Sequence, residues 1–152
     1  AEEIAKKLAT DKLDTTISDD IITVQIASII KNIIAIKSGI IQASGAGENA
    51  KAWLISRGLH EIATLSSALG GKSQSLALPA VIGDLVLTAY STTSRNTKFG
   101  YEFHKNNYSK EFLANYPILV EGMASAKLLK NFMQERKIEL DLPEVKSVMS
   151  LV

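Results

Sequence analysis

The sequence predicts an all-α protein, a bundle of six to eight helices. Its 152 residues fit one globular domain, and 46% of them are hydrophobic, which is enough to bury a real core. Apolar residues recur at helical spacing between residues of the kinds that begin and end helices. Three prolines, nine glycines and 6% aromatic residues argue against a turn-rich β-sandwich, and we find no internal repeat or series of strands.

The first strong helix signal begins at Ser18-Asp19-Asp20, a typical N-cap with acidic residues beside it. The helix predicted from about residue 19 to residue 43 is apolar on nearly every face. We therefore expect it to run through the core rather than over it. We interpret the glutamates and lysines of residues 2–7 as the solvated surface of a helix, where i,i+4 ion pairs can form.

The segments that follow are also helical, and their limits are set by glycines, prolines and capping residues. A second long helix is predicted over 48–69 and stops at Gly70-Gly71. The run 118–120 is expected to be extended, because Pro117 restricts the residue before it and the run is short and mostly β-branched. The remaining helical segments are 73–78, 80–90, 94–105, 109–116, 122–137 and a last one beginning at Pro143.

The charge balance and the missing cysteines exclude several classes of protein. Seventeen Lys and Arg against sixteen Asp and Glu give a net charge of +1, too little for a broad nucleic-acid-binding face. Without cysteine there is no disulfide and no thiolate nucleophile, and the two histidines have no metal-ligand spacing. The most apolar run, residues 21–36, is shorter than the ~20 residues of a membrane span. The N-terminus has no signal-peptide pattern, so we expect a soluble, cytoplasmic protein.

Two charged residues stand alone in apolar segments. Lys31 is the only charged residue between residues 21 and 36, and Asp84 is the only one between residues 73 and 94. An isolated ion is costly to desolvate, so we expect these two to meet. A structural ion pair, or a Lys31 that extends to the surface, would explain the pattern without a function. In the functional interpretation, Lys31 is a general base and Asp84 is the carboxylate that orients it.

A third polar feature, Ser94-Arg95-Asn96, lies where a loop should enter a helix. The N-terminal amides of a helix attract anions, and a guanidinium group is suited to phosphate oxygens. An ordinary helix start with a solvated arginine is the alternative. Taken with Lys31 and Asp84, the triplet suggests a site for a small phosphorylated alcohol, with all three groups at the rim of one cavity.

The stretches that carry these residues resemble, in order and spacing, the C-terminal helical domain of bacterial NAD(P)-dependent glycerol-3-phosphate dehydrogenases. The resemblance covers roughly residues 17–152, and its stretches are Ser18–Ile21, Lys31–Ile36, Ser56–Leu59, Gly83–Thr88, Ser94–Asn96 and Val120–Gly122. It implies a helix bundle like the C-terminal domain of 6-phosphogluconate dehydrogenase-like proteins. It also implies an oxidoreductase that interconverts glycerol 3-phosphate and dihydroxyacetone phosphate for the synthesis of glycerophospholipid precursors.

The same resemblance implies roles for particular residues. Lys31 falls on the family's catalytic lysine, which binds substrate and acts as general base on the C2 hydroxyl. The other substrate-binding positions fall on Asp84, Thr88, Ser94, Arg95 and Asn96. The positions that contact the nicotinamide dinucleotide, NAD or NADP, fall on Arg95, Leu119 and Glu121. No metal site is implied.

Most of the family's nucleotide-binding Rossmann domain has no counterpart in this sequence. Residues 1–16 resemble the end of that domain and its linker, and residues 17–152 resemble the helical substrate-binding and catalytic domain. Gly45–Ala50 fits the Gly-x-Gly-x-x-Gly/Ala pattern, but it follows a helix and not a strand, so we interpret it as an interhelical loop. The sequence therefore indicates a truncated dehydrogenase whose cofactor is bound mostly by the missing domain. We expect no turnover by this chain alone.

Two functions stay open at this point. The first is the catalytic and substrate-binding half of a glycerol-3-phosphate dehydrogenase. Its expected partners are a small phosphorylated substrate and a nicotinamide dinucleotide, and it is expected to bind no nucleic acid and to have no membrane span. The second is an inactive remnant that keeps the helical fold and, as one option, forms a homodimer. The choice between NAD and NADP is not fixed by this sequence, because it is made in the missing domain.

Overall fold

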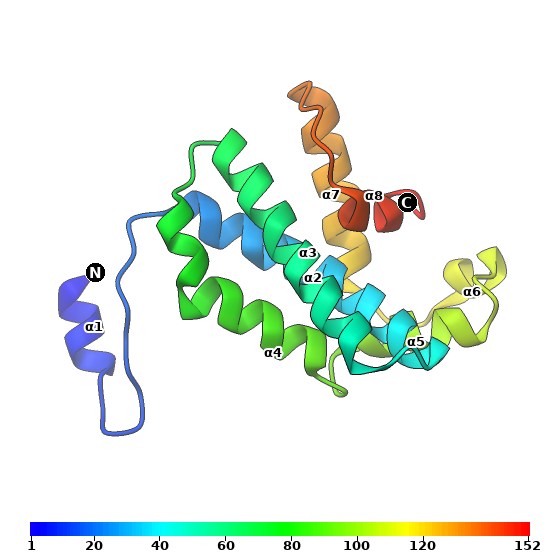
Figure 1. Ribbon diagram of the computed structural model, residues 1–152, viewed down its shortest axis with the longest axis horizontal. Coiled ribbons are helices and arrows are strands. Elements are labelled where there is room, and N and C mark those ends of the chain that lie inside the picture. Colours follow the sequence, from blue (N-terminus) through cyan, green and yellow to red (C-terminus); the bar gives the residue numbers. More distant parts are fainter.

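The computed structural model describes all 152 residues and shows helices arranged around one central helix (Figure 1). No strand is present apart from an isolated bridge between Thr10 and Leu13, so the predicted all-α class is confirmed. In chain order the elements are α1 (Glu2–Leu8), α2 (Ile21–Ser44), α3 (Gly47–Ala68), the 3-10 turn η1 (Ser73–Ala77), the π-helical turn η2 (Pro79–Gly83), α4 (Asp84–Tyr90), α5 (Arg95–Lys105), α6 (Lys110–Asn115), α7 (Glu121–Glu135) and α8 (Pro143–Met149).

The central helix is α2, as its all-round apolar pattern predicts. Asp20 caps its first turn by accepting a hydrogen bond from the backbone N–H of Thr23 at 3.0 Å, and Gly45 ends it in the left-handed conformation, with φ 76°. Helices α3, α4, α5 and α7 all pack against it. By length and composition alone its 24 residues could cross a bilayer, which corrects the estimate from residues 21–36. Its surroundings are those of a core helix, with ten of its residues buried.

Helices α2 and α5 approach each other closely where two glycines lie at their crossing. A Cβ atom at Gly39 would lie 2.0 Å from the carbonyl oxygen of Thr97, and one at Gly100 would lie 1.9 Å from the carbonyl oxygen of Ile36. Neither position has room for a side chain. This close contact places the N-terminal turn of α5 against the middle of α2 and so positions the candidate site.

Two predicted segments differ in detail from the structure. The 3-10 turn η1 ends at Ala77, just before Pro79, and Pro79 then begins the turn η2. This turn continues directly into α4, so the segment predicted as one helix over 80–90 is π-helical up to Gly83 and α-helical after it. Val120 has the expected extended backbone, with φ −104° and ψ 108°, but the run 118–120 pairs with no strand. The run instead leads into α7, whose first residue is Glu121.

The two ends of the chain are held differently. Helix α1 has no buried residue and is set apart from the other helices (Figure 1), and its Glu3 and Lys7 form the expected i,i+4 ion pair at 2.7 Å. Helix α8 is anchored by the fully buried Glu61 of α3, which accepts the backbone N–H groups of Glu144 and Val145 at 2.8 and 2.9 Å. Burial raises the pKa of Glu61 above its ordinary value.

Candidate functional site

The two isolated charges meet, as the sequence predicts. Helices α2 and α4 lie side by side, and the Nζ of Lys31 donates to Oδ2 of Asp84 at 2.5 Å. The side chains are 21% and 34% exposed, so the pair lies at the surface of the bundle, within reach of a ligand. A second contact ties the same two helices, because the buried hydroxyl of Ser38 donates to the carbonyl oxygen of Ala89 at 2.5 Å.

Thr88 lies one turn after Asp84 on α4 and contacts its other carboxylate oxygen. The hydroxyl of Thr88 donates to Oδ1 of Asp84 at 3.3 Å, while Oδ2 receives the ammonium group of Lys31. Asp84 thus has a partner at each of its two carboxylate oxygens. The contact with Lys31 is the stronger one, because both groups are charged, whereas 3.3 Å is long for a hydrogen bond from a hydroxyl group.

Ser94 and Arg95 occupy the start of α5, as predicted. The hydroxyl of Ser94 caps the helix by accepting the backbone N–H of Thr97 at 3.4 Å. Arg95 is 62% exposed at the first helical position, and its guanidinium group forms an ion pair with Glu121 at the start of α7. The structure thus brings together two of the residues expected to contact the dinucleotide. Leu119, the third, lies two residues before Glu121 and is 72% exposed.

Asn96 connects three helices and is itself buried, with 4% of its surface exposed. Its amide nitrogen donates to Oδ1 of Asn32 on α2 at 3.1 Å, and its amide oxygen accepts the backbone N–H of Gly122 on α7 at 2.9 Å. Asn32 follows Lys31 directly in the chain. The Asn32–Asn96 hydrogen bond therefore joins the segment of α2 that carries Lys31 to the first turn of α5, which carries Arg95. We refer to the Lys31–Asp84 and Arg95–Glu121 pairs with this link as the strip. The predicted contact between Asn96 and substrate stays a prediction.

Sequence reasoning did not give Asn32 a role of its own. The sequence shows that Asn32 follows Lys31 directly. Its hydrogen-bond partner Asn96, however, is 64 residues away in the chain and belongs to another helix. Neighbouring residues of a helix point in different directions. An asparagine beside the lysine was therefore as consistent with a solvated side chain as with a link to α5.

The strip is open to solvent rather than enclosed. Lys31, Asp84 and Arg95 line none of the five main hollows of the surface. The common cavity expected from the sequence stays a prediction. No group of three or more His, Asp or Glu side chains is placed to hold a metal ion.

Comparison with known proteins identifies relatives for this arrangement. Residues 20–152 match the family model described as the C-terminus of NAD-dependent glycerol-3-phosphate dehydrogenase. The chain is 48% identical over 154 residues to the glycerol-3-phosphate dehydrogenase [NAD(P)+] of Rickettsia rickettsii, and 44% identical over 155 residues to that of Rickettsia bellii. These alignments cover 100% of this chain but only 45% and 49% of the relatives, so the chain spans about half of their length.

Two solved structures have the same fold. The crystal structure of glycerol-3-phosphate dehydrogenase from Coxiella burnetii matches with a TM-score of 0.83 at 33% identity, over 97% of this chain and 45% of the crystallised one. The glycerol-3-phosphate dehydrogenase of Saccharomyces cerevisiae matches with a TM-score of 0.84 over 99% of this chain and 44% of its own length. At 18% identity, the yeast structure supports the fold alone.

Proposed function

Because the chain belongs to the family of the NAD-dependent glycerol-3-phosphate dehydrogenase C-terminus, we propose that it is the helical catalytic and substrate-binding half of such an enzyme. The reaction is the interconversion of glycerol 3-phosphate and dihydroxyacetone phosphate with NAD or NADP, which supplies precursors of glycerophospholipids. The observation that carries the proposal is that Lys31 meets Asp84 and Arg95 meets Glu121, while the Asn32–Asn96 hydrogen bond joins the helices of Lys31 and Arg95.

Lys31 is the proton carrier in this proposal. Oxidation of a secondary alcohol removes a proton from the hydroxyl oxygen and a hydride from the same carbon. The neutral amine of Lys31 takes the proton from the C2 hydroxyl, and in the reverse direction the ammonium group returns it. The nicotinamide ring, when bound, supplies the acceptor for the hydride. Asp84, held by Thr88, orients the ammonium group and stabilises it once it is protonated.

The start of α5 holds the phosphate group of the substrate. Ser94, Arg95 and the free backbone amides of the first turn provide hydrogen-bond donors, and the helix dipole favours a negative charge there. Arg95 reaches both the substrate phosphate and the cofactor, since its ion pair with Glu121 places it at the residues expected to contact the dinucleotide. Leu119 presents an exposed aliphatic side chain beside them, which fits the flat face of a nicotinamide ring.

The open strip also supports the second candidate function, that of a helical domain without turnover. The chain spans about half of its relatives, and its candidate residues line none of the five main hollows of the surface. A nucleotide-binding domain placed over these residues would exclude water and bind the rest of the dinucleotide. The proposal therefore assigns catalysis to this chain only in combination with such a domain.

A chimera separates the two candidates. The chain replaces the 154 aligned residues of the Rickettsia rickettsii enzyme, and NADH oxidation is measured with dihydroxyacetone phosphate. We expect turnover by the chimera and none by the chain alone. A folded chimera that binds NADH but does not turn over would support the inactive domain. Robust turnover by the isolated chain would contradict the need for a second domain.

A further inference from the structure

The start of α5 contacts the start of α7 through two consecutive residues of each helix. The guanidinium group of Arg95 forms an ion pair with Glu121. At the next position of each helix, the side-chain oxygen of Asn96 accepts the backbone N–H of Gly122 at 2.9 Å. A Cβ atom at Gly122 would lie 2.5 Å from the carbonyl oxygen of Asn32, so this turn of α7 also rests directly on α2. The backbone that carries Glu121 is therefore held in place beside Arg95.

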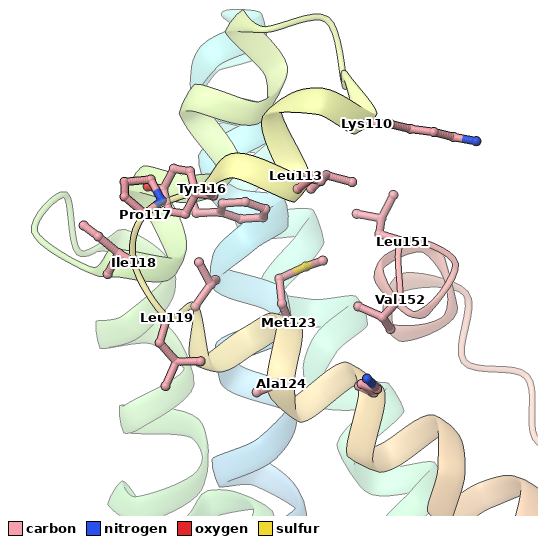
Figure 2. Close-up of a pocket in the computed structure, with 14 residues that line it drawn as sticks. Lys110, Leu113, Tyr116, Pro117, Ile118, Leu119, Met123, Ala124, Leu151 and Val152 are labelled. Carbon is pink, nitrogen blue, oxygen red and sulfur yellow. The ribbon is translucent and has the colours of Figure 1, made fainter.

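The segment that enters α7 leaves Glu121 accessible to a ligand. Figure 2 shows the run from Pro117 through Ile118 to Leu119, which leads into α7. The side chains of Ile118 and Leu119 are exposed, and that of Glu121 is 37% exposed. The carboxylate of Glu121 can therefore be reached from solvent while it contacts Arg95.

This ion pair occupies the group to which the proposed function assigns the substrate phosphate. The contact is made at Nη2 of Arg95. Both edges of a guanidinium group that can hold a phosphate through two N–H groups include this nitrogen. A phosphate that approaches either edge therefore meets the carboxylate of Glu121 and is repelled by its negative charge. The pair can be opened, because ion pairs between partly exposed side chains contribute little to stability.

We propose that Glu121 competes with the substrate phosphate for Arg95, and that the dinucleotide relieves this competition. The inference rests on the proposed function, in which Arg95 binds the phosphate and Glu121 contacts the cofactor. Hydroxyl and amide groups of a dinucleotide are hydrogen-bond donors that a carboxylate accepts. A Glu121 side chain turned toward such donors leaves Nη2 of Arg95 free for the phosphate. The two ligands then strengthen each other's binding, as thermodynamic linkage requires.

The first test needs only the 152-residue chain and glycerol 3-phosphate, titrated while the backbone amide NMR signals of residues 95–97 are followed. Glu121→Gln removes the negative charge and keeps the shape of the side chain. We expect this variant to bind glycerol 3-phosphate roughly threefold more tightly than the unmodified chain, or better. A variant that fails to fold cannot gain affinity in this way. Glu111→Gln, which removes an exposed acidic residue from the first turn of α6, is the matched control and should leave the affinity unchanged.

A double-mutant cycle separates competition for Arg95 from general repulsion. In a chain that carries Arg95→Ala, Glu121→Gln should no longer raise the affinity, because there is no guanidinium group to release. An equal gain with and without Arg95, or no gain in either chain, would overturn the proposal. If Arg95→Ala alone still weakens binding in that case, the phosphate contact of the proposed function stands. If Arg95→Ala has no effect, that contact fails together with the competition.

The coupling to the dinucleotide is measured by calorimetric titration of the chimera. NADH and glycerol 3-phosphate are both reduced, so they bind together without reacting. We expect NADH to raise the affinity for glycerol 3-phosphate, and we expect a smaller gain in the chimera that carries Glu121→Gln. The absence of a gain, or an equal gain in both proteins, would overturn the coupling.

Discussion

The Nζ of Lys31 lies 2.5 Å from Oδ2 of Asp84, although 53 residues separate the two in the chain. Each is the only charged residue of an apolar segment, and the ion pair gives each charge a partner of opposite sign. Such a pair at a bundle surface would be unremarkable as a stabilising contact, since partly exposed ion pairs contribute little. It becomes the centre of the candidate site because Asn32, the residue after Lys31, is hydrogen-bonded to Asn96 in the turn that carries Arg95.

Replacement of Lys31 by methionine should separate function from stability. Because the pair is partly exposed, Lys31→Met should lower the free energy of unfolding by only about 1 kcal/mol. In the chimera it should lower the rate of NADH oxidation at least 100-fold, since general acid–base groups contribute roughly that much or more. Chemical denaturation and the NADH assay measure the two effects. Lys72→Met, which removes the exposed pair with Asp19, is the control and should keep full activity. Retained activity in Lys31→Met would remove this lysine from the mechanism.

Replacement of Arg95 by alanine should weaken ligands that carry phosphate. A charge-assisted hydrogen bond is worth about 1.5–3 kcal/mol, so affinity for glycerol 3-phosphate in the chimera should fall by roughly ten- to 100-fold. Calorimetric titration measures it directly. Lys98→Ala removes a neighbouring positive charge that is 63% exposed on the same helix and should have little effect. Equal losses in the two variants would indicate general electrostatic attraction instead of a phosphate contact.

The fold was predictable from the sequence because its main determinants are local. The caps at Asp20 and Ser94 and the all-round apolar pattern of residues 19–43 identified the helices and the central one. The Lys31–Asp84 contact was predictable because isolated charges in apolar segments require partners. The linking role of Asn96 was not predictable from the sequence. Its buried amide connects Asn32 to Gly122, and this connection depends on how three helices are placed.

Replacement of Gly100 by alanine should disrupt the α2–α5 crossing. The new Cβ would lie 1.9 Å from the carbonyl oxygen of Ile36, a backbone atom that cannot turn away. We expect a loss of about 3 kcal/mol in the free energy of unfolding, at the upper end for overpacking. Gly83→Ala is the matched control, since its Cβ would meet nothing closer than Pro79 at 3.8 Å. That control should keep or slightly raise stability in urea titrations. Similar losses in both variants would show that helix packing at Gly100 is looser than the structure indicates.

Removal of the Glu61 carboxylate should loosen α8. Glu61→Ala leaves the N–H groups of Glu144 and Val145 without acceptors, and each unsatisfied buried group costs about 1–3 kcal/mol. Relief of a buried charge offsets part of this cost, so we expect a net loss of about 3 kcal/mol. Hydrogen exchange should show faster exchange first in residues 143–149. Glu139→Ala, at an exposed position near α8, should change neither stability nor exchange. Unchanged protection of α8 in Glu61→Ala would contradict its anchoring role.

Asp20 should make the stability of the protein depend on acid pH. Hydrogen bonds from Thr23, assisted by the backbone N–H of Lys72, hold the pKa of Asp20 well below its ordinary value of 3.8. The folded state therefore binds a proton less readily than the unfolded chain does. The stabilisation by Asp20 is fully present above the unfolded pKa and is lost as the pH falls through 3.8 toward the folded value. Asp20→Asn should thus flatten the rise in stability between about pH 2 and about pH 5. Urea unfolding at several pH values measures it, with Asp14→Asn, at an exposed position, as the control. An identical pH dependence in Asp20→Asn and the unmodified chain would show that the cap does not depend on the charge of Asp20.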